Sequence, residues 1–302
     1  MNSVDVNVQK SETEQNQAPT GIHVIWRELA KDKLALFSLI LFIGVVLFIY
    51  IYSFLLDQSA VTTINLRNIF SPPNAENWLG TDYGGRDVFG QLVIGARNSL
   101  TIGIVITLVT SFIGITLGVI AGYFGGWVDY IIMRFIDFIL VLPTTMLIIV
   151  FVSLVPRFNV VNFIFIMSLF YWTAIARLIR SKTLAERELD YVSASKTLGS
   201  PNWKIILFQV LPNLSSIIIV NMTLNLAGNI GIETGLSYLG FGLPESVPSL
   251  GTLISYSTNP DVMQNKWWVW LPAAILILVL MLCINFVGQA LKRAADARQR
   301  LG

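Results

Sequence analysis

Long uncharged stretches, separated by charged or Gly- and Pro-rich connections, dominate the chain. The first runs over 34–56, where 23 consecutive residues carry no charge. A bilayer core about 30 Å thick needs about 20 apolar residues in a helix, so this stretch is long enough to span it, and no small-residue cleavage site follows it. We expect helical membrane spans at 34–56 and at about 99–121, 131–155, 158–176, 214–235 and 267–291. The pattern predicts an all-α integral membrane protein with six spans.

The connections between these stretches differ in length and composition. A tail over 1–33, polar over 1–20, precedes the first span, and residues 292–302 form a short tail after the last. The loop 57–97 is rich in turn-forming residues, whereas the connection 177–213 holds nine charged residues. The first span is therefore set apart by a loop from a core of five spans over 98–291.

The placement of Lys and Arg predicts the orientation. If the N-terminus lies inside, 15 of the 20 basic residues fall in cytoplasmic segments and five fall in outer ones. Cytoplasmic connections of membrane proteins carry this excess of positive charge. We therefore expect both termini, and the connection 177–213, on the cytoplasmic side.

Composition excludes several classes of protein. The chain is 54% hydrophobic and only 13% charged, against about 25% charged residues in ordinary soluble proteins. A net charge of +2, from dispersed basic residues, does not favour nucleic acid. The single cysteine, Cys283, excludes a Cys-based metal cluster, and the single histidine, His23, excludes a His-rich metal site, so we expect no metal site. No glycine is followed by lysine, so the chain lacks a phosphate-binding P-loop and energy must come from another chain.

The cytoplasmic connection has the pattern of a helix–turn–helix elbow. Residues 184–198 are predicted to be helical, and Gly199 and Pro201 are typical of a helix end followed by a new start. A second helix is expected over 203–210, with a boundary at Pro212. On periodicity alone, an amphipathic segment lying on the membrane surface is the better interpretation.

The residues of this elbow resemble the cytoplasmic coupling loop of ABC importer permeases, which docks in a groove of an ATPase subunit. The resemblance covers 191–199, 203–206 and 210–213, and the family's Gly-to-Pro spacing is kept. Ser193 stands where the family has Glu, Ser195 where it has Ala, and Gln209 where His is frequent. Without the acid, docking would rest on shape and on the apolar face of the elbow. The resemblance implies ATPase contacts by Tyr191, Ser193, Ala194, Ser195, Leu198, Gly199 and Trp203.

Further motifs are similar to the C-type permease subunit of oligopeptide and dipeptide importers. They lie at 80–88, 95–100, 122–129 and 236–242, and the resemblance covers about 22–298. It implies a type I ABC importer permease fold in a bacterial plasma membrane, with the 34–56 helix added to a five-helix core. The implied partners are a sister permease that completes a heterodimer, two ATPase subunits that bind ATP and Mg²⁺, and an extracellular peptide-binding protein. This chain would bind no cofactor itself, and nickel or another small solute is the alternative cargo.

Polar residues inside the fifth predicted span are candidates for lining a substrate path through the membrane. Asn221, Asn225, Asn229 and Glu233 recur every four residues, which places them on one slowly winding helix face. Such a face cannot point at lipid. It either lines the path and offers amides to a peptide backbone, or it forms hydrogen bonds within the bundle, and both can hold along one stripe.

Two other sets of residues favour packing or ion pairing. Gly114, Gly118 and Gly122 are spaced to let another helix approach closely. Arg134 and Asp137 stand three residues apart, so we expect them to pair on one helix face near the inner interface.

In the outer loop, Asp82, Arg86 and Asp87 are candidates for two roles. They could cap and cross-link the turns of the loop. They could instead contact the protein that delivers the substrate, because the loop faces the side on which that partner would dock.

Two other classes of function compete with an ATP-driven permease. A membrane enzyme would need a Ser–His pair, paired acids or a metal site, and Asp137 and Glu233 lie near opposite membrane faces. An ion-coupled carrier could use either acid as its proton site, although such carriers often contain internal repeats and none is visible here. We therefore expect a non-catalytic permease subunit.

Overall fold

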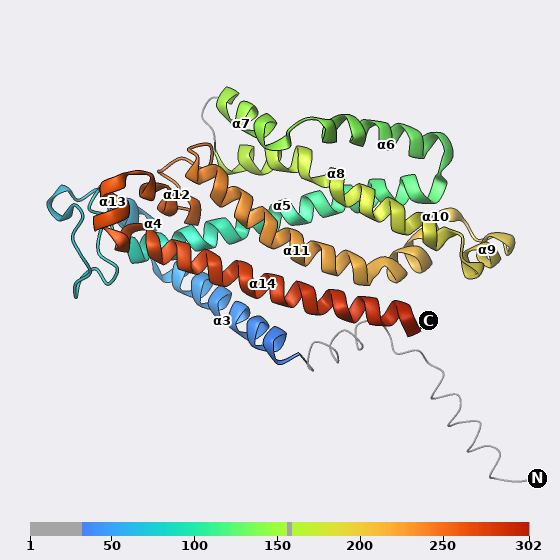
Figure 1. Cartoon of the computed structure of the whole chain (residues 1–302), viewed down its shortest axis with the longest axis horizontal. Coiled ribbons are helices and arrows are strands. Elements are labelled where there is room, and N and C mark those ends of the chain that lie inside the picture. The colour runs from blue at the N-terminus through green and yellow to red at the C-terminus, as the bar shows by residue number, and fades with distance from the viewer. Residues whose placement is uncertain (1–31, 156–158, 302) are drawn as a thin grey trace, which may run out of the picture.

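The computed structural model describes residues 32–155 and 159–301, and most of these residues are helical. Figure 1 shows an elongated bundle with helices α9 (Asp190–Thr197) and α10 (Asn202–Ile205) at one end and loops with short helices at the other. Following the predicted orientation, we call these the inner and the outer end. Most of the predicted polar tail at 1–33 lies outside the described residues.

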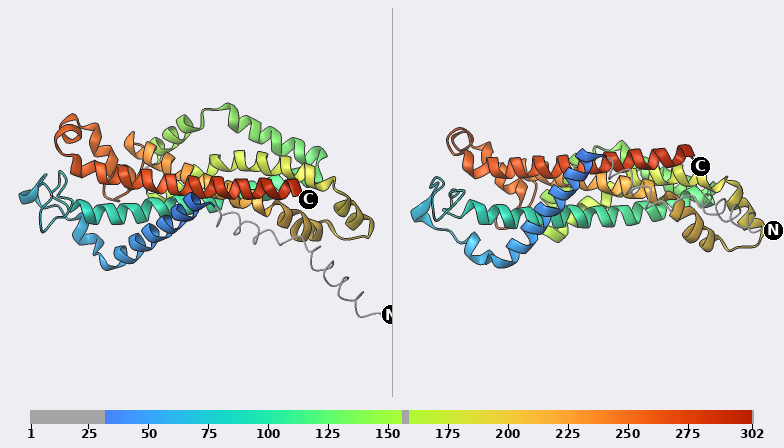
Figure 2. Two further views of the ribbon diagram at one scale, coloured as in Figure 1. Left: turned by 60° about the horizontal axis from the view of Figure 1, so that its bottom comes forward. Right: turned by 90° about the horizontal axis from the view of Figure 1, so that it is seen from below.

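Helix α3, Lys33–Leu55, is the predicted first span. Asp32 begins it, because its side chain accepts hydrogen bonds from the backbone N–H groups of Leu34 and Ala35, at 3.1 and 3.2 Å. The helix crosses the bundle obliquely beside α14, Trp267–Leu301, as both views of Figure 2 show. Most of α3 exposes large apolar side chains, as expected of a helix that faces lipid.

The helices of the core are longer than the predicted spans. Helix α5 covers Val88–Phe124, so it begins well before the end of the predicted loop 57–97. Helix α8 covers Val160–Arg187 and continues into the predicted connection 177–213. Helix α14 likewise continues beyond the predicted end of its span at 291. Five helices of the described chain are long and apolar enough to cross a membrane.

The predicted third span, 131–155, is not one straight helix. It is a pair of helices, α6 (Gly126–Val141) and α7 (Thr144–Leu154), which are bent by 79° relative to each other. The break falls at Leu142 and Pro143. A residue before proline avoids the helical conformation, which explains why the first helix ends there. Counting the bent pair as one span brings the described chain to six.

The outer end is closed by short elements. Helix α4 (Gln58–Thr62) and a turn of 3₁₀-helix at Leu66–Asn68 lie in the first loop. After helix α11 (Leu211–Tyr238) come helix α12 (Leu250–Ser255), a 3₁₀ turn at Tyr256–Thr258 and helix α13 (Pro260–Asn265). Helix α12 lies against α5, α11 and α14, where Leu250 and Leu253 are buried in the core.

Candidate functional site

The inner elbow is built from two short helices joined by a tight turn. Helix α9 covers Asp190–Thr197 and helix α10 covers Asn202–Ile205. Between them Gly199 has φ +76°, a conformation that glycine adopts without strain. The N–H groups of Gly199 and Ser200 return to the carbonyls of Lys196 and Ser195, both at 3.0 Å, and end α9 as the sequence predicts.

Two details of the predicted elbow are corrected. The expected helix over 184–198 is interrupted, because Leu189 has an extended backbone that separates α8 from α9. This change of direction brings Val192 into the core beside Ile179 and Ile205, so tertiary packing overrides the helical periodicity.

The second correction concerns Pro212, where we expect a boundary and the structure has none. The helix is continuous over Asn202–Tyr238, with one wide π turn at Ile206–Val210 before α11, Leu211–Tyr238. In that turn the N–H of Leu211 bonds to the carbonyl of Ile206, five residues earlier. Proline has no N–H to donate and crowds the carbonyl four residues before it, so a wider turn next to Pro212 accommodates the ring.

Apolar contacts and hydrogen bonds hold the buried side of the elbow, which we call its root, against α5 and α8. Val192 and Ile205 are both fully buried, next to Val119 of α5. The amide of Gln209 donates to Ser195 Oγ at 2.9 Å and so connects α9 to the π turn. The elbow is therefore a rigid projection of the bundle.

The elbow also exposes large apolar side chains, beside two exposed lysines, Lys196 and Lys204. Leu198, Trp203 and Phe208 are 85%, 57% and 70% exposed, and Ser193 and Ala194 are exposed beside them. Large apolar side chains gathered on a projecting surface are typical of an interaction site. Of the predicted coupling residues, the structure places Leu198, Trp203, Ser193, Ala194 and Gly199 on the open surface.

Tyr191 has a different position from its neighbours. Its hydroxyl donates to Glu186 at 2.6 Å and accepts from Asn213 at 2.9 Å, so it joins α8, α9 and α11. Burial and the bond to the Glu186 carboxylate raise the pKa of Tyr191 to about 12, so the phenol stays protonated. Within this chain, Tyr191 fixes the angle of the elbow.

The polar stripe of α11 divides into two halves. At the outer half, Glu233 is fully buried and accepts hydrogen bonds from Ser99 and Ser237, at 2.9 and 3.0 Å. Asn229 is also buried and donates to Thr107 Oγ1 at 2.9 Å. These two residues join α11 to α5 inside the bundle.

The inner half of the stripe is less enclosed. Asn225 donates to Asn221 at 2.6 Å on the same helix, and both side chains are half-buried. Neither has a partner on another helix among the described residues. Path lining along this stripe stays a prediction, and it would rest on Asn221 and Asn225.

Ion pairs connect α6 to α8 at the inner end. Asp137 pairs with Arg177 at 2.5 Å, and Asp129 pairs with Arg180. The predicted pair between Arg134 and Asp137 is wrong. Arg134 instead lies over the ring of Tyr130, 5.3 Å from its centre, because Arg177 on the neighbouring helix reaches Asp137.

The glycine stripe of α5 lies directly against α8. A Cβ atom on Gly114, Gly118 or Gly122 would come within 2.6–2.7 Å of atoms of α8. In the case of Gly118 the obstacle is the backbone carbonyl of Ala176. The absence of side chains therefore sets the separation of α5 and α8, which carry the root of the elbow.

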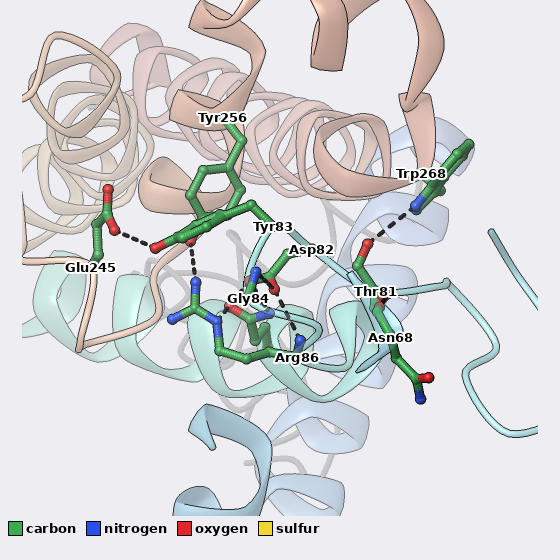
Figure 3. Close-up of polar contacts among 10 residues, drawn as sticks. Asn68, Thr81, Asp82, Tyr83, Gly84, Arg86, Glu245, Tyr256 and Trp268 are labelled. Atoms are coloured by element: carbon green, nitrogen blue, oxygen red, sulfur yellow. Dashed lines mark hydrogen bonds and ion pairs between the residues drawn. The ribbon is translucent and has the colours of Figure 1, made fainter. Parts of the chain in front are cut away.

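The outer loop is organised around one buried carboxylate, shown in Figure 3. Asp82 is fully buried and accepts from the N–H groups of Gly84 and Arg86, from Gln91, and from Arg86 Nε at 2.8 Å. Asp87 accepts from the N–H of Gly90 at 2.7 Å and begins α5. Asp82, Arg86 and Asp87 thus cap and cross-link the turns. Contact between this loop and a delivering protein stays a prediction, and it would involve other atoms of the loop.

A cavity of about 940 Å³ opens beside this loop. Its lining includes Tyr83, Tyr238 at the end of α11, Glu245 and Tyr256. Tyr83 donates to Glu245 at 2.5 Å, and Arg86 donates to the hydroxyl of Tyr256 at 3.2 Å (Figure 3). Burial raises the pKa of both tyrosines, so both remain neutral. Sequence reasoning missed this set, because 239–249 shows only Gly and Pro turns and no periodicity.

A bundle of long apolar helices with a projecting elbow defines a multi-pass membrane protein of the transport class. Its fold resembles that of the methionine ABC transporter MetNI in an inward-facing conformation, with a TM-score of 0.52 and 21% identity over 68% of this chain and 96% of that one. The chain belongs to the family of binding-protein-dependent transport system inner membrane components, whose model matches residues 114–300. Residues 22–73 match the N-terminal transmembrane domain of oligopeptide transport permease C. The predicted family and permease fold are confirmed.

Relatives with named roles are similar over almost the whole chain. The oligopeptide transport system permease protein OppC of Lactococcus lactis subsp. cremoris (strain SK11) is 50% identical, over 92% of this chain and 95% of its own. The oligopeptide transport system permease protein AmiD of Streptococcus pneumoniae is 37% identical, with 90% of each chain covered. The dipeptide transport system permease protein DppC of Bacillus subtilis is 35% identical, over 91% of this chain and 85% of its own.

Proposed function

We propose that this chain is a permease subunit of an ATP-driven importer that passes oligopeptides or dipeptides into the cell. The observation that carries the proposal is the continuous helix from Asn202 to Tyr238, which joins the exposed elbow to the polar stripe. The names of its relatives, which are oligopeptide and dipeptide permeases, support the choice of cargo.

The proposed assembly needs other chains. A sister permease would complete the path as a heterodimer, a peptide-binding protein would dock at the outer end, and two ATPase subunits would bind ATP and Mg²⁺. The apolar surface around Leu198 and Trp203 is the surface on which an ATPase groove would close. This chain would have no catalytic role.

The proposed mechanism is alternating access driven through the elbow. Closure of the ATPases on ATP displaces residues 186–211. Because α10, the π turn and α11 form one helix, this displacement turns the half-buried Asn221 and Asn225 toward or away from the path. The ion pairs of Asp129 and Asp137 with α8 would make α6 follow the same movement.

Deletion of residues 193–199 tests the proposal. The deletion removes the turn at Gly199 and the exposed Leu198 but leaves every membrane helix in place. We expect ATP-dependent peptide uptake into vesicles containing the complete transporter to fall to background, and the ATPase subunits to be lost on purification, while the chain still inserts into the membrane. Normal uptake by the deletion variant would overturn the proposal.

Cysteine labelling separates path from packing along the stripe. In a Cys283→Ser background, Asn221→Cys and Asn225→Cys should react with a water-soluble maleimide, because both positions are half-buried without partners on other helices. Asn229→Cys should be protected by its contact with α5. Protection at all three positions would assign the whole stripe to packing.

A further inference from the structure

Glu245 is an acid whose charge is not balanced within the described part of the chain. It lies at the outer end, in the segment between α11 and α12, and its side chain is exposed to the cavity. None of the ion pairs formed by the described residues includes it. Within 32–155 and 159–301, only Tyr83 donates a hydrogen bond to it, at Oε2, and Oε1 has no donor there.

The other charges around the cavity cancel in pairs. Asp82 is neutralised by Arg86, with 2.8 Å between carboxylate and guanidinium. Lys266, which lies over the ring of Phe70, is paired with Asp261. Counted over the described residues alone, the cavity therefore carries one net negative charge, at Glu245.

The hydroxyl groups of the two tyrosines complete a polar site. The rings of Tyr83 and Tyr256 meet edge to face, with 5.3 Å between their centres, on the wall that also holds Glu245. Tyr256 accepts a hydrogen bond from Arg86, and its own proton has no acceptor among the described residues. The site thus offers a carboxylate oxygen that accepts and, nearby, a phenol that donates.

These groups match one end of a peptide better than they match a metal ion. An ammonium group has three donors and no acceptor, so it satisfies Glu245 Oε1, while the Tyr256 hydroxyl can donate to a nearby peptide carbonyl. A divalent cation such as Ca²⁺ takes about 6–8 oxygen ligands, which one carboxylate and two phenols do not supply. A cavity of about 940 Å³ holds several peptide residues.

We propose that the cavity binds a protonated amine of the transported peptide, with Glu245 as its counter-ion and the hydroxyls of Tyr83 and Tyr256 orienting it. This inference rests on the proposed function, because it takes the ligand to be a peptide. The site would receive the peptide at the outer end, before it reaches the inner half of the α11 stripe.

A protection experiment on the complete transporter, without the delivering protein, tests the site. Thr258 lines the cavity and its hydroxyl bonds only to a carbonyl of its own turn, so Thr258→Cys in a Cys283→Ser background is a mild reporter. The reporter is labelled with a maleimide in the presence of tetra-alanine, N-acetyl-tetra-alanine or N-acetyl-Ala-Lys-Ala-Ala. Protection by tetra-alanine identifies the amino terminus as the ligand, and protection by the lysine peptide identifies a side-chain amine.

Substitutions then assign the interaction to Glu245. We expect Glu245→Gln to raise the half-protecting concentration of amine-containing peptides roughly 10-fold or more, the loss typical of a charge-assisted hydrogen bond. Tyr83→Phe should weaken protection less, because the carboxylate remains. The matched control is Glu76→Gln, which removes an exposed outer-loop carboxylate that does not line the cavity.

Two results would overturn the proposal. One is that no amine-containing peptide protects the reporter in the parent. The other is that N-acetyl-tetra-alanine, which has no amine, protects as well as the amine-containing peptides, or that these peptides protect the Glu245→Gln variant as well as the parent. ATP-dependent uptake of tetra-alanine by the parent, with the delivering protein present, is measured separately. Uptake without amine-selective protection rejects only this site, whereas absence of uptake rejects the proposed function.

Discussion

The two ends of the bundle differ in which groups they expose and which they bury. At the inner end, the elbow exposes Leu198, Trp203 and Phe208, with the Lys204 ammonium over the ring of Trp203. At the outer end, Asp82 and Arg86 are buried against each other, and the loop encloses a polar cavity. The difference indicates that the exposed apolar side chains of the inner end suit contact with another protein. At the outer end the charges are paired within the loop, and the polar groups that line the cavity suit contact with a ligand.

The largest effect is expected from placing charge on the elbow. Leu198→Asp combined with Trp203→Asp should abolish ATPase association and lower peptide uptake about 30-fold or more, because two central apolar contacts become charged. Co-purification with the ATPase subunits and uptake into vesicles measure this. Glu188→Gln, on an exposed elbow residue, is the control, and a doubly charged elbow that still binds the ATPases would refute the interface.

A large effect on stability is expected from Asp82→Ala at the outer end. The substitution leaves the buried Arg86 guanidinium without its partner and frees three further donors, which costs about 3–5 kcal/mol. Limited proteolysis of the outer loop and thermal unfolding of the purified complex should both show it. An unchanged unfolding temperature would mean that the loop does not depend on this carboxylate.

A smaller loss of stability is expected from Gly118→Ala in the helix pair that supports the elbow. The new methyl group meets the carbonyl of Ala176 at 2.6 Å, and overpacking of this kind costs about 1–3 kcal/mol. Gly228→Ala is the matched control, because a Cβ there meets nothing within 4 Å. Equal unfolding temperatures for the two variants would contradict close packing of α5 on α8.

The smallest effect is expected at the first turn of α5. Asp87→Ala removes the side chain that accepts from the Gly90 N–H, and loss of such a cap costs about 1 kcal/mol. The same unfolding measurement applies, and Asp87→Asn should restore most of the loss. A loss as large as that of Asp82→Ala would mean that Asp87 does more than cap the helix.

Local features of the fold were predictable because they depend on neighbours along the chain. The apolar stretches predict α3 and α14, and Gly199 with Pro201 predicts the end of α9 and the start of α10. The bend at Leu142 is visible in the sequence as a proline that follows it, but the length of the apolar stretch hides it.

Pairing between helices was not predictable in the same way. Asp137 has Arg134 one turn away, yet it pairs with Arg177, which is 40 residues further along the chain. Tyr83 and Glu245 are 162 residues apart, and no periodicity connects them. Such partners are decided by which helices and loops lie side by side in the folded chain.

The amino-acid sequence by itself determined the class of this protein, its membrane helices, its predicted orientation and the elbow, because hydrophobicity, basic residues and turn-forming residues act locally. Tertiary structure alone decided that Asn229 and Glu233 are enclosed while Asn221 and Asn225 are not. It also placed Glu245 in a cavity where no described residue forms an ion pair with it. The physical reason is that burial and charge pairing depend on distances through space, which packing of α5, α8 and α11 sets after the helices have formed.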